Sequence, residues 1–182
     1  YDLNRNFPDP NGAQYSGAPR QTETTLMMNL GMEQRFHLVA NFHGGAEVVN
    51  YPWDHQYTLH TDDAWYQSIS RAYASSAQNN GPAGYLDDLE NGITNGAQWY
   101  VTTGNRQDWT NYAARGREVT IEVSNTKNPA ASTLPGFWTY NYDALLGYLE
   151  QGLYGIHGIV KDVWDNPLQA TITVMNHDDA LT

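Results

Sequence analysis

The sequence predicts an α/β fold, and three observations support this interpretation. Residues 38–40 form a short apolar run, as in a strand that is buried on both faces. Residues 118–123 alternate in type, as expected of a second strand. Apolar residues with helical spacing occur before the first strand, at 19–34, and after the second, at 137–153. This succession of helices and strands is typical of α/β domains.

The remaining segments complete this outline. Turn-forming residues predict a loop over Asn4–Ser16, and a helix is expected to follow over Pro19–Gln34. A second helix is expected over 61–76, because Thr61 can cap it and the acidic residues after Thr61 suit a helix N-terminus. Residues 78–84 are expected to form a loop, and Phe137–Leu153 a third helix.

The sequence changes character after residue 154. Ile156–Val160 and Ala170–Val174 are rich in strand-forming residues, and Asp165-Asn166-Pro167 between them is typical of a turn. We therefore expect two units, with residues 1–154 as one domain and residues 155–182 as the first strands of an all-β module. Because the second segment is too short to stand alone, the module is expected to be truncated or packed onto the first domain.

Composition limits the possible functions. The chain has 182 residues, of which 40% are hydrophobic, so it can form a sizeable core. A net charge of −11 disfavours nucleic acid or an anionic membrane as the main partner and is compatible with a cationic substrate. The lack of cysteine excludes disulfides and thiolate metal sites. No apolar run reaches the roughly 18 residues of a membrane span. Without a signal peptide or an initial Met, the sequence is expected to be mature or excerpted.

His43 is the first candidate for chemistry. It ends the apolar strand, and Gly44 and Gly45 after it leave clear space beyond the imidazole. Ligands and catalytic groups gather beyond the carboxyl ends of strands in α/β sheets. His43 is therefore a candidate metal ligand or catalytic base. A His that caps a strand end, or that is satisfied within the core, would fit the same pattern.

Glu122 and Arg5 are further candidates. Glu122 lies near the end of the second strand, on the face opposite Val119 and Ile121. A carboxylate tuned there by burial or by a metal can act as a general base, whereas an exposed acid on a polar face would have no such role. Arg5 follows Asn4 in a loop, where a guanidinium beside an amide suits the capture of a carboxylate. A surface ion pair would also explain Arg5.

Three more polar residues carry weaker signals. Tyr100 follows Trp99 and precedes a flexible segment, so its phenol is a candidate for a mobile group over a pocket. Core packing is the simpler role for one Tyr among 13. Asp54 and Gln107 have no specific signal of their own, because most exposed acids and amides have no specific role.

Seven motifs occur in a fixed order along the chain: Asp2-Leu3-Asn4-Arg5-Asn6-Phe7-Pro8-Asp9, Asn41-Phe42-His43-Gly44-Gly45, Asn50-Tyr51-Pro52-Trp53-Asp54, Gly92-Ile93-Thr94-Asn95-Gly96-Ala97, Trp99-Tyr100, Gln107-Asp108-Trp109 and Glu118-Val119-Thr120-Ile121-Glu122-Val123-Ser124. They resemble the zinc metallocarboxypeptidases, in particular the regulatory branch that contains carboxypeptidases N, E, M and D. The tail from residue 155 resembles the opening of that branch's transthyretin-like β-sandwich. The resemblance implies α/β/α layers around a mixed central sheet, followed by the β module.

The resemblance implies that the chain carries part of a zinc site. His43 matches the third zinc ligand, so one Zn²⁺ is the implied cofactor. Glu122 matches the catalytic glutamate, which deprotonates a metal-activated water and passes the proton to the leaving amine. The other two ligands of this family come from an upstream His-x-x-Glu motif, and the 182 residues contain none. We therefore expect both ligands, and an arginine that polarises the carbonyl, before Tyr1. The chain alone should bind zinc weakly.

The resemblance also implies how a substrate is held. Asn4 and Arg5 match the pair that grips the terminal carboxylate, and Tyr100 matches the mobile tyrosine that closes over the last residue. Asp54 and Gln107 match positions in the side-chain pocket. An acid at Asp54 resembles the branch that removes Lys or Arg, and a cation pairs favourably with a partly desolvated carboxylate.

One short segment departs from the pattern of the branch. Asn105-Arg106 stands where the branch usually has Gly followed by an apolar residue. Asn tolerates left-handed backbone, so the loop is expected to be kept. Arg106 beside Gln107 is expected to alter the preference for basic residues by repulsion.

Together these features predict a zinc-dependent exopeptidase that releases C-terminal Lys or Arg from peptides or proteins and is secreted or periplasmic, as is usual in the family. The alternative is a non-catalytic protein that binds basic C termini with Asn4, Arg5 and Asp54 but lacks a complete zinc site. The presence of Glu122, which serves turnover, argues against it. A carbohydrate-binding or glycosidase domain would fit 13 Tyr, 6 Trp and an acidic balance, but it does not explain the ordered motifs. The oligomeric state is left open.

Overall fold

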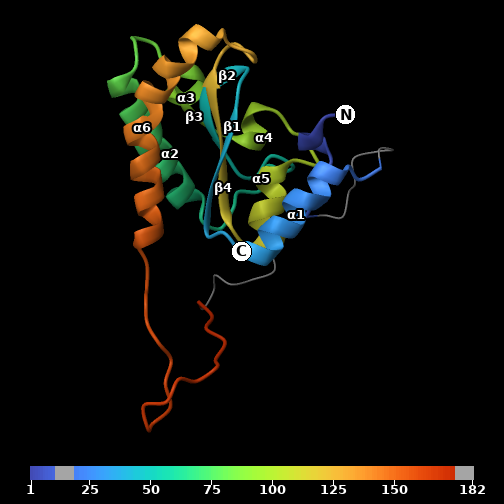
Figure 1. The fold of residues 1–182 in the computed structure, drawn as a ribbon, viewed down its shortest axis with the longest axis vertical. Coiled ribbons are helices and arrows are strands. Elements are labelled where there is room, and N and C mark those ends of the chain that lie inside the picture. The colour runs from blue at the N-terminus through green and yellow to red at the C-terminus, as the bar shows by residue number, and fades with distance from the viewer. Residues whose placement is uncertain (11–18, 175–182) are drawn as a thin grey trace.

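A mixed four-stranded sheet with helices on both faces forms the body of the protein (Figure 1). The computed structural model describes residues 1–10 and 19–174, so the end of the predicted loop and the last eight residues of the tail lie outside the described residues. The helices and strands are α1 (Thr22–Gln34), β1 (Leu38–His43), β2 (Ala46–Tyr51), α2 (Asp63–Asn80), α3 (Asp88–Asn91), β3 (Ile93–Asn95), α4 (Gly96–Trp99), α5 (Arg106–Trp109), β4 (Arg117–Ser124) and α6 (Leu134–Glu150). Single-turn helices lie at Leu3–Arg5, Thr110–Ala114, Ala131–Thr133 and Gln151–Leu153.

The strand order β1-β4-β2-β3 brings the ends of the two predicted strands together. β1 and β4 run parallel, with His43 opposite Glu122 in the register. β2 runs antiparallel to β4, and β3 runs parallel to β2. Because parallel neighbours end at the same edge of a sheet, the last residue of β1 and the end of β4 meet at one point.

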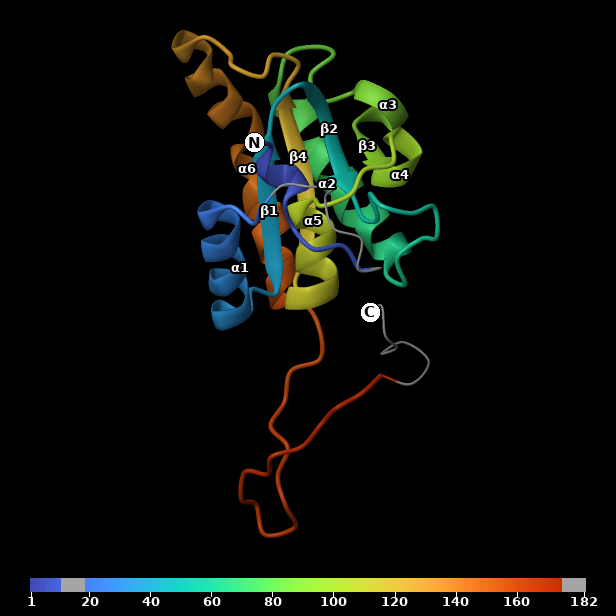
Figure 2. The ribbon, with the colours of Figure 1, turned by 90° about the vertical axis from the view of Figure 1, so that its right-hand side faces the viewer.

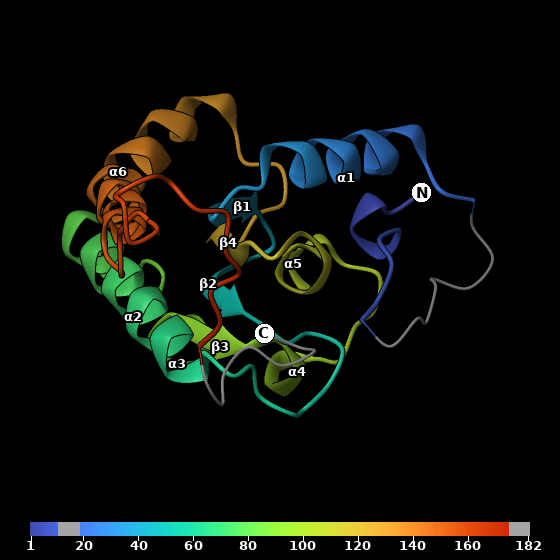
Figure 3. The same ribbon diagram turned by 90° about the horizontal axis from the view of Figure 1, so that it is seen from below.

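Helices cover both faces of this sheet. Figures 2 and 3 show α2 and α6 on one face, and α1 and α5 on the other. The main apolar core lies under α2 and α6, where strand residues such as Val49 and Ile121 pack against helix residues such as Ile69 and Tyr73. The predicted α/β/α arrangement with a mixed central sheet is therefore confirmed.

The two faces of β4 have different chemistry, as its alternating sequence predicts. Val119 and Ile121 are fully buried in the main core. Thr120 and Glu122 point to the opposite face, where they line a cavity. The alternation of side chains along a strand therefore separates the residues that stabilise the sheet from those available for chemistry.

Several predicted helix boundaries are wrong. α1 begins at Thr22 rather than at Pro19, and α6 ends at Glu150 rather than at Leu153. α2 continues to Asn80 rather than ending near residue 76, because Ala74 and Ala77 extend its buried face. Gly81, at its C-cap, ends the helix. α6 begins at Leu134 rather than 137, because the Pro in its first turn is compatible with a helix start.

The tail after Tyr154 extends away from the domain (Figure 2). Within the described residues 155–174 there is no strand, and one antiparallel bridge joins Lys161 to Pro167. The second module, predicted for residues 155–182, therefore stays a prediction. In the part of the chain that the structure describes, none of the helices has both the length and the apolar character needed to cross a membrane.

Candidate active site

One cavity brings together residues that lie far apart in the sequence. The empty space between its walls is about 330 Å³, which includes open solvent. Six of the seven site residues predicted from the sequence line it, namely Asn4, Arg5, His43, Asp54, Tyr100 and Glu122. The seventh, Gln107, is buried beside Asp54, toward which it donates a hydrogen bond. The cavity walls also include Asn50, Gly96, Trp99, Thr102 and Thr120.

His43 and Glu122 lie side by side at the cavity wall. The imidazole Nδ1 is 3.7 Å from the Glu122 carboxylate, which is too long for a hydrogen bond. Burial raises the pKa of the Glu122 carboxyl, and Lys127 opposes this increase. Burial, followed by the positive charge of Arg106, lowers the pKa of His43. Both shifts favour a neutral imidazole and a carboxyl group that holds a proton more readily than usual.

His43 fits the requirements of a single metal ligand. It lines the cavity from a strand end, and its lowered pKa favours the neutral imidazole that a metal ion requires. One carboxylate oxygen of Glu122, Oε2, is buried and has no hydrogen-bond partner among the described residues, so it is available to a water or a metal-bound group. Within residues 1–10 and 19–174, no group of three His, Asp, Glu or Cys side chains could hold a metal ion. The described residues therefore fit one position of a zinc site and do not form the whole site.

The loop with Asn4 and Arg5 is held against residues 104–106. Asn4 Oδ1 accepts a hydrogen bond from the backbone N–H of Arg106 at 2.9 Å, and Arg5 Nη1 donates to the backbone oxygen of Asn4 at 2.7 Å. Gly104 packs directly on the Arg5 backbone, where a Cβ atom would lie 2.5 Å from the Arg5 oxygen. Gly104 also has a φ of +74°, so the position favours glycine for two reasons.

Asp54 is a buried carboxylate in a frame of amides. Asn50 donates to Asp54 Oδ1 at 2.9 Å and Gln107 at 3.3 Å. Burial, followed by the negative charge of Asp108, raises the pKa of Asp54 well above its usual value. The amide oxygens of Asn50 and Gln107 are also buried and lack hydrogen-bond donors among the described residues. The frame therefore offers unused acceptors next to a carboxylate, which is the arrangement that a cationic group requires.

Glycine at position 96 makes this frame possible. A Cβ atom at Gly96 would lie 1.6 Å from Asp54 Oδ1 and 3.0 Å from Asn50 Oδ1. The Asp54 carboxylate therefore occupies the space that any side chain at position 96 would need.

Tyr100 lies at the rim of the cavity rather than in the core. Its side chain is 49% exposed, and its ring meets Trp99 edge-on at 5.0 Å between centroids. A tyrosine packed into the core would be buried, so the alternative of core packing is wrong for this residue.

The departure at Asn105-Arg106 has a different effect from the one expected. Asn105 has a φ of −87°, and the left-handed position is Gly104 instead. Asn105 accepts a hydrogen bond from the backbone N–H of Asp108 and so caps α5. Arg106 donates from Nε to the buried carboxylate of Glu118 at 2.8 Å and does not line the cavity. Its charge is paired there, but it still lowers the pKa of His43, so its effect on the preference for basic residues stays a prediction.

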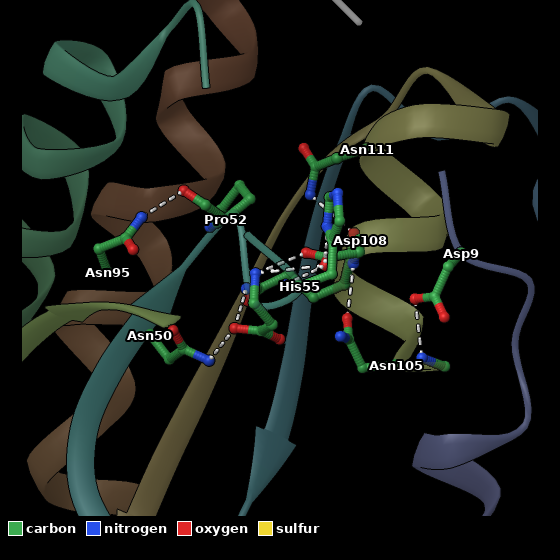
Figure 4. Close-up of polar contacts among 11 residues, drawn as sticks. Asp9, Asn50, Pro52, His55, Asn95, Asn105, Asp108 and Asn111 are labelled. Atoms are coloured by element: carbon green, nitrogen blue, oxygen red, sulfur yellow. Dashed lines mark hydrogen bonds and ion pairs between the residues drawn. The ribbon is translucent and has the colours of Figure 1, made fainter. Parts of the chain in front are cut away.

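Three features of the site were missed in the sequence. Asn50 and Gly96 lie within quoted motifs, but only their contacts with Asp54 reveal what they do. The third is a buried polar network in which Asp108 contacts His55 (Figure 4). The spacing of 53 residues between these two gives no local sequence signal.

Comparisons with known proteins point to one family. A sequence model described as zinc carboxypeptidase matches residues 1–144. Carboxypeptidase D of Anas platyrhynchos is 40% identical over 195 residues, which cover 97% of this chain and 14% of that protein. Carboxypeptidase M of Mus musculus is 35% identical over 184 residues, covering 94% of this chain and 41% of that protein.

Solved structures show the same fold. Carboxypeptidase A from Helicoverpa armigera matches with a TM-score of 0.68 at 16% identity, over 82% of this chain and 41% of that one. Thrombin activatable fibrinolysis inhibitor matches with a TM-score of 0.58 at 14% identity, over 83% of this chain and 41% of that one. The chain thus spans less than half the length of these proteins and of the two carboxypeptidases above.

Proposed function

Because the chain belongs to the zinc carboxypeptidase family, we propose that it forms part of a peptidase that releases C-terminal Lys or Arg from peptides or proteins. One observation carries this proposal. A single cavity contains the guanidinium of Arg5, the buried carboxylate of Asp54, and the adjacent pair His43 and Glu122. A C-terminal Lys or Arg has a carboxylate and a cation on one residue, with the scissile bond beside them.

The terminal carboxylate of the substrate would bind Arg5 and Asn4. Arg5 Nη1 donates a hydrogen bond to the backbone oxygen of Asn4. The guanidinium has further N–H groups that can donate to a substrate carboxylate. Pairing of Arg with a carboxylate is both strong and directional. Such a pair restricts cleavage to the last residue, because an internal residue has no free carboxylate.

The basic side chain would bind the acceptor frame around Asp54. The Asp54 carboxylate supplies the negative charge, and the amide oxygen of Asn50, which also lines the cavity, supplies a further acceptor, while Gln107 supports Asp54 from behind. A bound cation would also stabilise the ionised form of Asp54, whose pKa is raised by burial. A neutral apolar side chain would leave these buried acceptors unpaired, which is costly.

Glu122 would act as the general base, and His43 would hold zinc as one of its ligands. Bound zinc supplies Lewis-acid polarisation of the scissile carbonyl. Glu122 suits proton transfer, because it is buried at the cavity wall, its pKa is raised by burial, and its Oε2 atom has no partner among the described residues. The carboxylate would take a proton from water and give it to the leaving amine.

Replacement of Glu122 by Gln tests the proposal. We expect the full-length, zinc-loaded protein to shorten a peptide ending in Arg by one residue, and Glu122→Gln to lower kcat by about 10²-fold or more while the peptide still binds. An unchanged kcat would remove Glu122 from its role. Binding without cleavage by the unaltered protein would instead favour a non-catalytic protein that binds C termini.

Replacement of Asp54 by Leu tests the substrate class. We expect Asp54→Leu to lower kcat/KM for a peptide ending in Arg, and to lower the ratio of this kcat/KM to that for a matched peptide ending in Leu. An unchanged Arg-to-Leu ratio would contradict the preference for basic residues. The β module over residues 155–182 and a secreted or periplasmic location stay predictions.

A further inference from the structure

Asp108 is a buried carboxylate that contacts the segment with Asp54 and lies outside the cavity wall. Its side chain is fully buried. It accepts hydrogen bonds from the backbone N–H of Asp54 at 3.0 and 3.2 Å and from that of His55 at 3.0 Å. His55 Nδ1 lies 2.7 Å from the same carboxylate (Figure 4). These contacts join α5 to residues 54 and 55.

Hydrogen bonds hold the backbone of α5 around Asp108 in place. The backbone N–H of Asp108 donates to Asn105 Oδ1 at 2.7 Å. Asn111 donates to the backbone oxygens of Gln107 at 2.9 Å and Glu118 at 3.0 Å, which ties α5 to β4. Residues 52–62, by contrast, form neither helix nor strand. We infer from this asymmetry that α5 positions the segment with Asp54, and not the reverse.

His55 completes the contact by giving the Asp108 carboxylate a side-chain donor. The His55 side chain is 3% exposed, and its ring lies edge-on to Trp53 with 5.4 Å between centroids. A buried carboxylate is costly unless donors surround it. The imidazole is therefore one of the contacts that hold the Asp108 carboxylate in place.

We propose that Asp108, together with His55, is a positioning residue that aims the Asp54 carboxylate into the cavity and so determines the preference for a basic C-terminal side chain. Neither residue lines the cavity, so neither is expected to touch the substrate. The inference rests on the proposed function, because it assigns to Asp54 the recognition of a cation. It extends that function to two buried residues behind the recognition site.

Charge and position can be separated at this contact. The negative charge of Asp108 raises the pKa of Asp54, and it also attracts any cation bound beside Asp54. His55→Phe leaves that charge in place and therefore tests position, whereas Asp108→Asn removes both effects of the charge, which act in opposite directions on the binding of a cation. The same variant keeps the side-chain volume but replaces one acceptor oxygen by an amide donor. Since the carboxylate accepts from three different donors, the amide must face at least one of them, which breaks the contact.

Four variants separate positioning from loss of stability. Asp108→Asn breaks the contact without a change in volume. His55→Phe keeps an aromatic ring against Trp53 but removes the donor, and His55→Gln restores an N–H donor. The control is Asn141→Ala in α6, which breaks a buried contact with Tyr73 on the face of the sheet opposite the cavity.

The test uses two peptides that differ only in the last residue, Arg or Leu. The decisive quantity is the ratio of their equilibrium affinities, called here the Arg-to-Leu ratio. Titration calorimetry on the full-length protein measures this ratio, and hydrolysis by the zinc-loaded protein gives kcat and KM. For Asp108→Asn and His55→Phe we expect a 10-fold or larger loss of affinity for the Arg peptide, because small misplacements of a binding group cost about 10²-fold. For the Arg peptide, KM should rise by a larger factor than kcat falls. The affinity for the Leu peptide should change by less than about 3-fold. His55→Gln should recover part of the loss.

The outcomes distinguish this inference from the proposed function. An unchanged Arg-to-Leu ratio in His55→Phe, or a ratio that falls equally in Asn141→Ala, would overturn the positioning role. A changed ratio in Asp108→Asn alone would assign the effect to charge and would also overturn it. If the unaltered protein binds the Arg peptide without cleaving it, the peptidase function fails, while the binding ratios still decide the inference. If it does not prefer the Arg peptide at all, both fail.

Discussion

Gly96→Ala should displace Asp54 and thereby reduce the preference for basic residues. In the native structure the new Cβ would lie 1.6 Å from Asp54 Oδ1 and 2.7 Å from its Cγ. Cβ atoms essentially never approach another atom closer than 3.0 Å, so the carboxylate must withdraw by about 1.4 Å. The nearest backbone cannot yield easily, because residue 97 donates to the Trp53 oxygen at 2.8 Å.

The cost of this displacement has two parts. Overpacking of a buried site costs about 1–3 kcal/mol of unfolding free energy. The hydrogen bond from Asn50 to Asp54, at 2.9 Å, would also be strained or lost, and a bond to a charged group contributes about 1.5–3 kcal/mol. A misplaced carboxylate should lower kcat/KM for a peptide ending in Arg by about 10²-fold, since a 1 Å error in a binding group has an effect of this size.

The assay compares hydrolysis of matched peptides ending in Arg and in Leu, with thermal unfolding measured in parallel. Gly147→Ala is the matched control, because a Cβ there has no neighbour within 4 Å and lies within α6. The free energy of unfolding of that variant should increase by up to about 1 kcal/mol, because Ala has a higher helix propensity than Gly, and its Arg-to-Leu ratio should stay unchanged. If Gly96→Ala lowers kcat/KM equally for the Arg and Leu peptides, or leaves the ratio of the two kcat/KM values unchanged, Asp54 does not recognise the basic side chain from its position in the structure.

Two further predictions address charge and backbone. Burial and then Asp108 raise the pKa of Asp54, and only the ionised form attracts a cation, so KM for an Arg peptide should fall as the pH rises through that pKa. KM for a Leu peptide, measured over the same pH series, should lack this step, and parallel curves would refute the assignment. Gly104→Ala places a Cβ 2.5 Å from the Arg5 oxygen at a φ of +74°, so it should lower kcat/KM for both peptides alike and reduce the free energy of unfolding by about 1–3 kcal/mol. Peptide kinetics and urea denaturation check this, and a loss confined to the Arg peptide would contradict the role of that loop in holding the carboxylate.

The fold was largely predictable because its main signals are local. The apolar run that ends at His43 and the alternation along 118–123 each reflect the surroundings of one strand. Helix ends were less predictable, since α2 continues to Asn80 through burial of Ala77 against the core, which is a tertiary contact. In the tail, the described residues 155–174 form no strand, and the β module predicted for 155–182 stays a prediction.

The sequence brought together residues that share a cavity, but it did not indicate their contacts. The motif order singled out six of the eleven residues that line the cavity and Gln107 behind it, and their roles stay predictions. No sequence pattern indicated that Gly96 would lie against Asp54, or that Arg106 would pair with Glu118. These contacts join residues that are 42 and 12 positions apart, and only the fold brings them together.

A single short segment contacts both of the groups that we propose recognise the substrate. Gly104 and Arg106 hold the loop with Arg5, while Gln107 and Asp108 hold Asp54. The proposed sites for the carboxylate and for the cation are therefore attached to the same five residues, and these are tied to β4 through Asn111. A ligand with both charges on one residue needs a fixed spacing between its two binding groups. This shared attachment supplies that spacing without requiring either loop to be rigid on its own, so substitutions at the two ends of the segment should be non-additive.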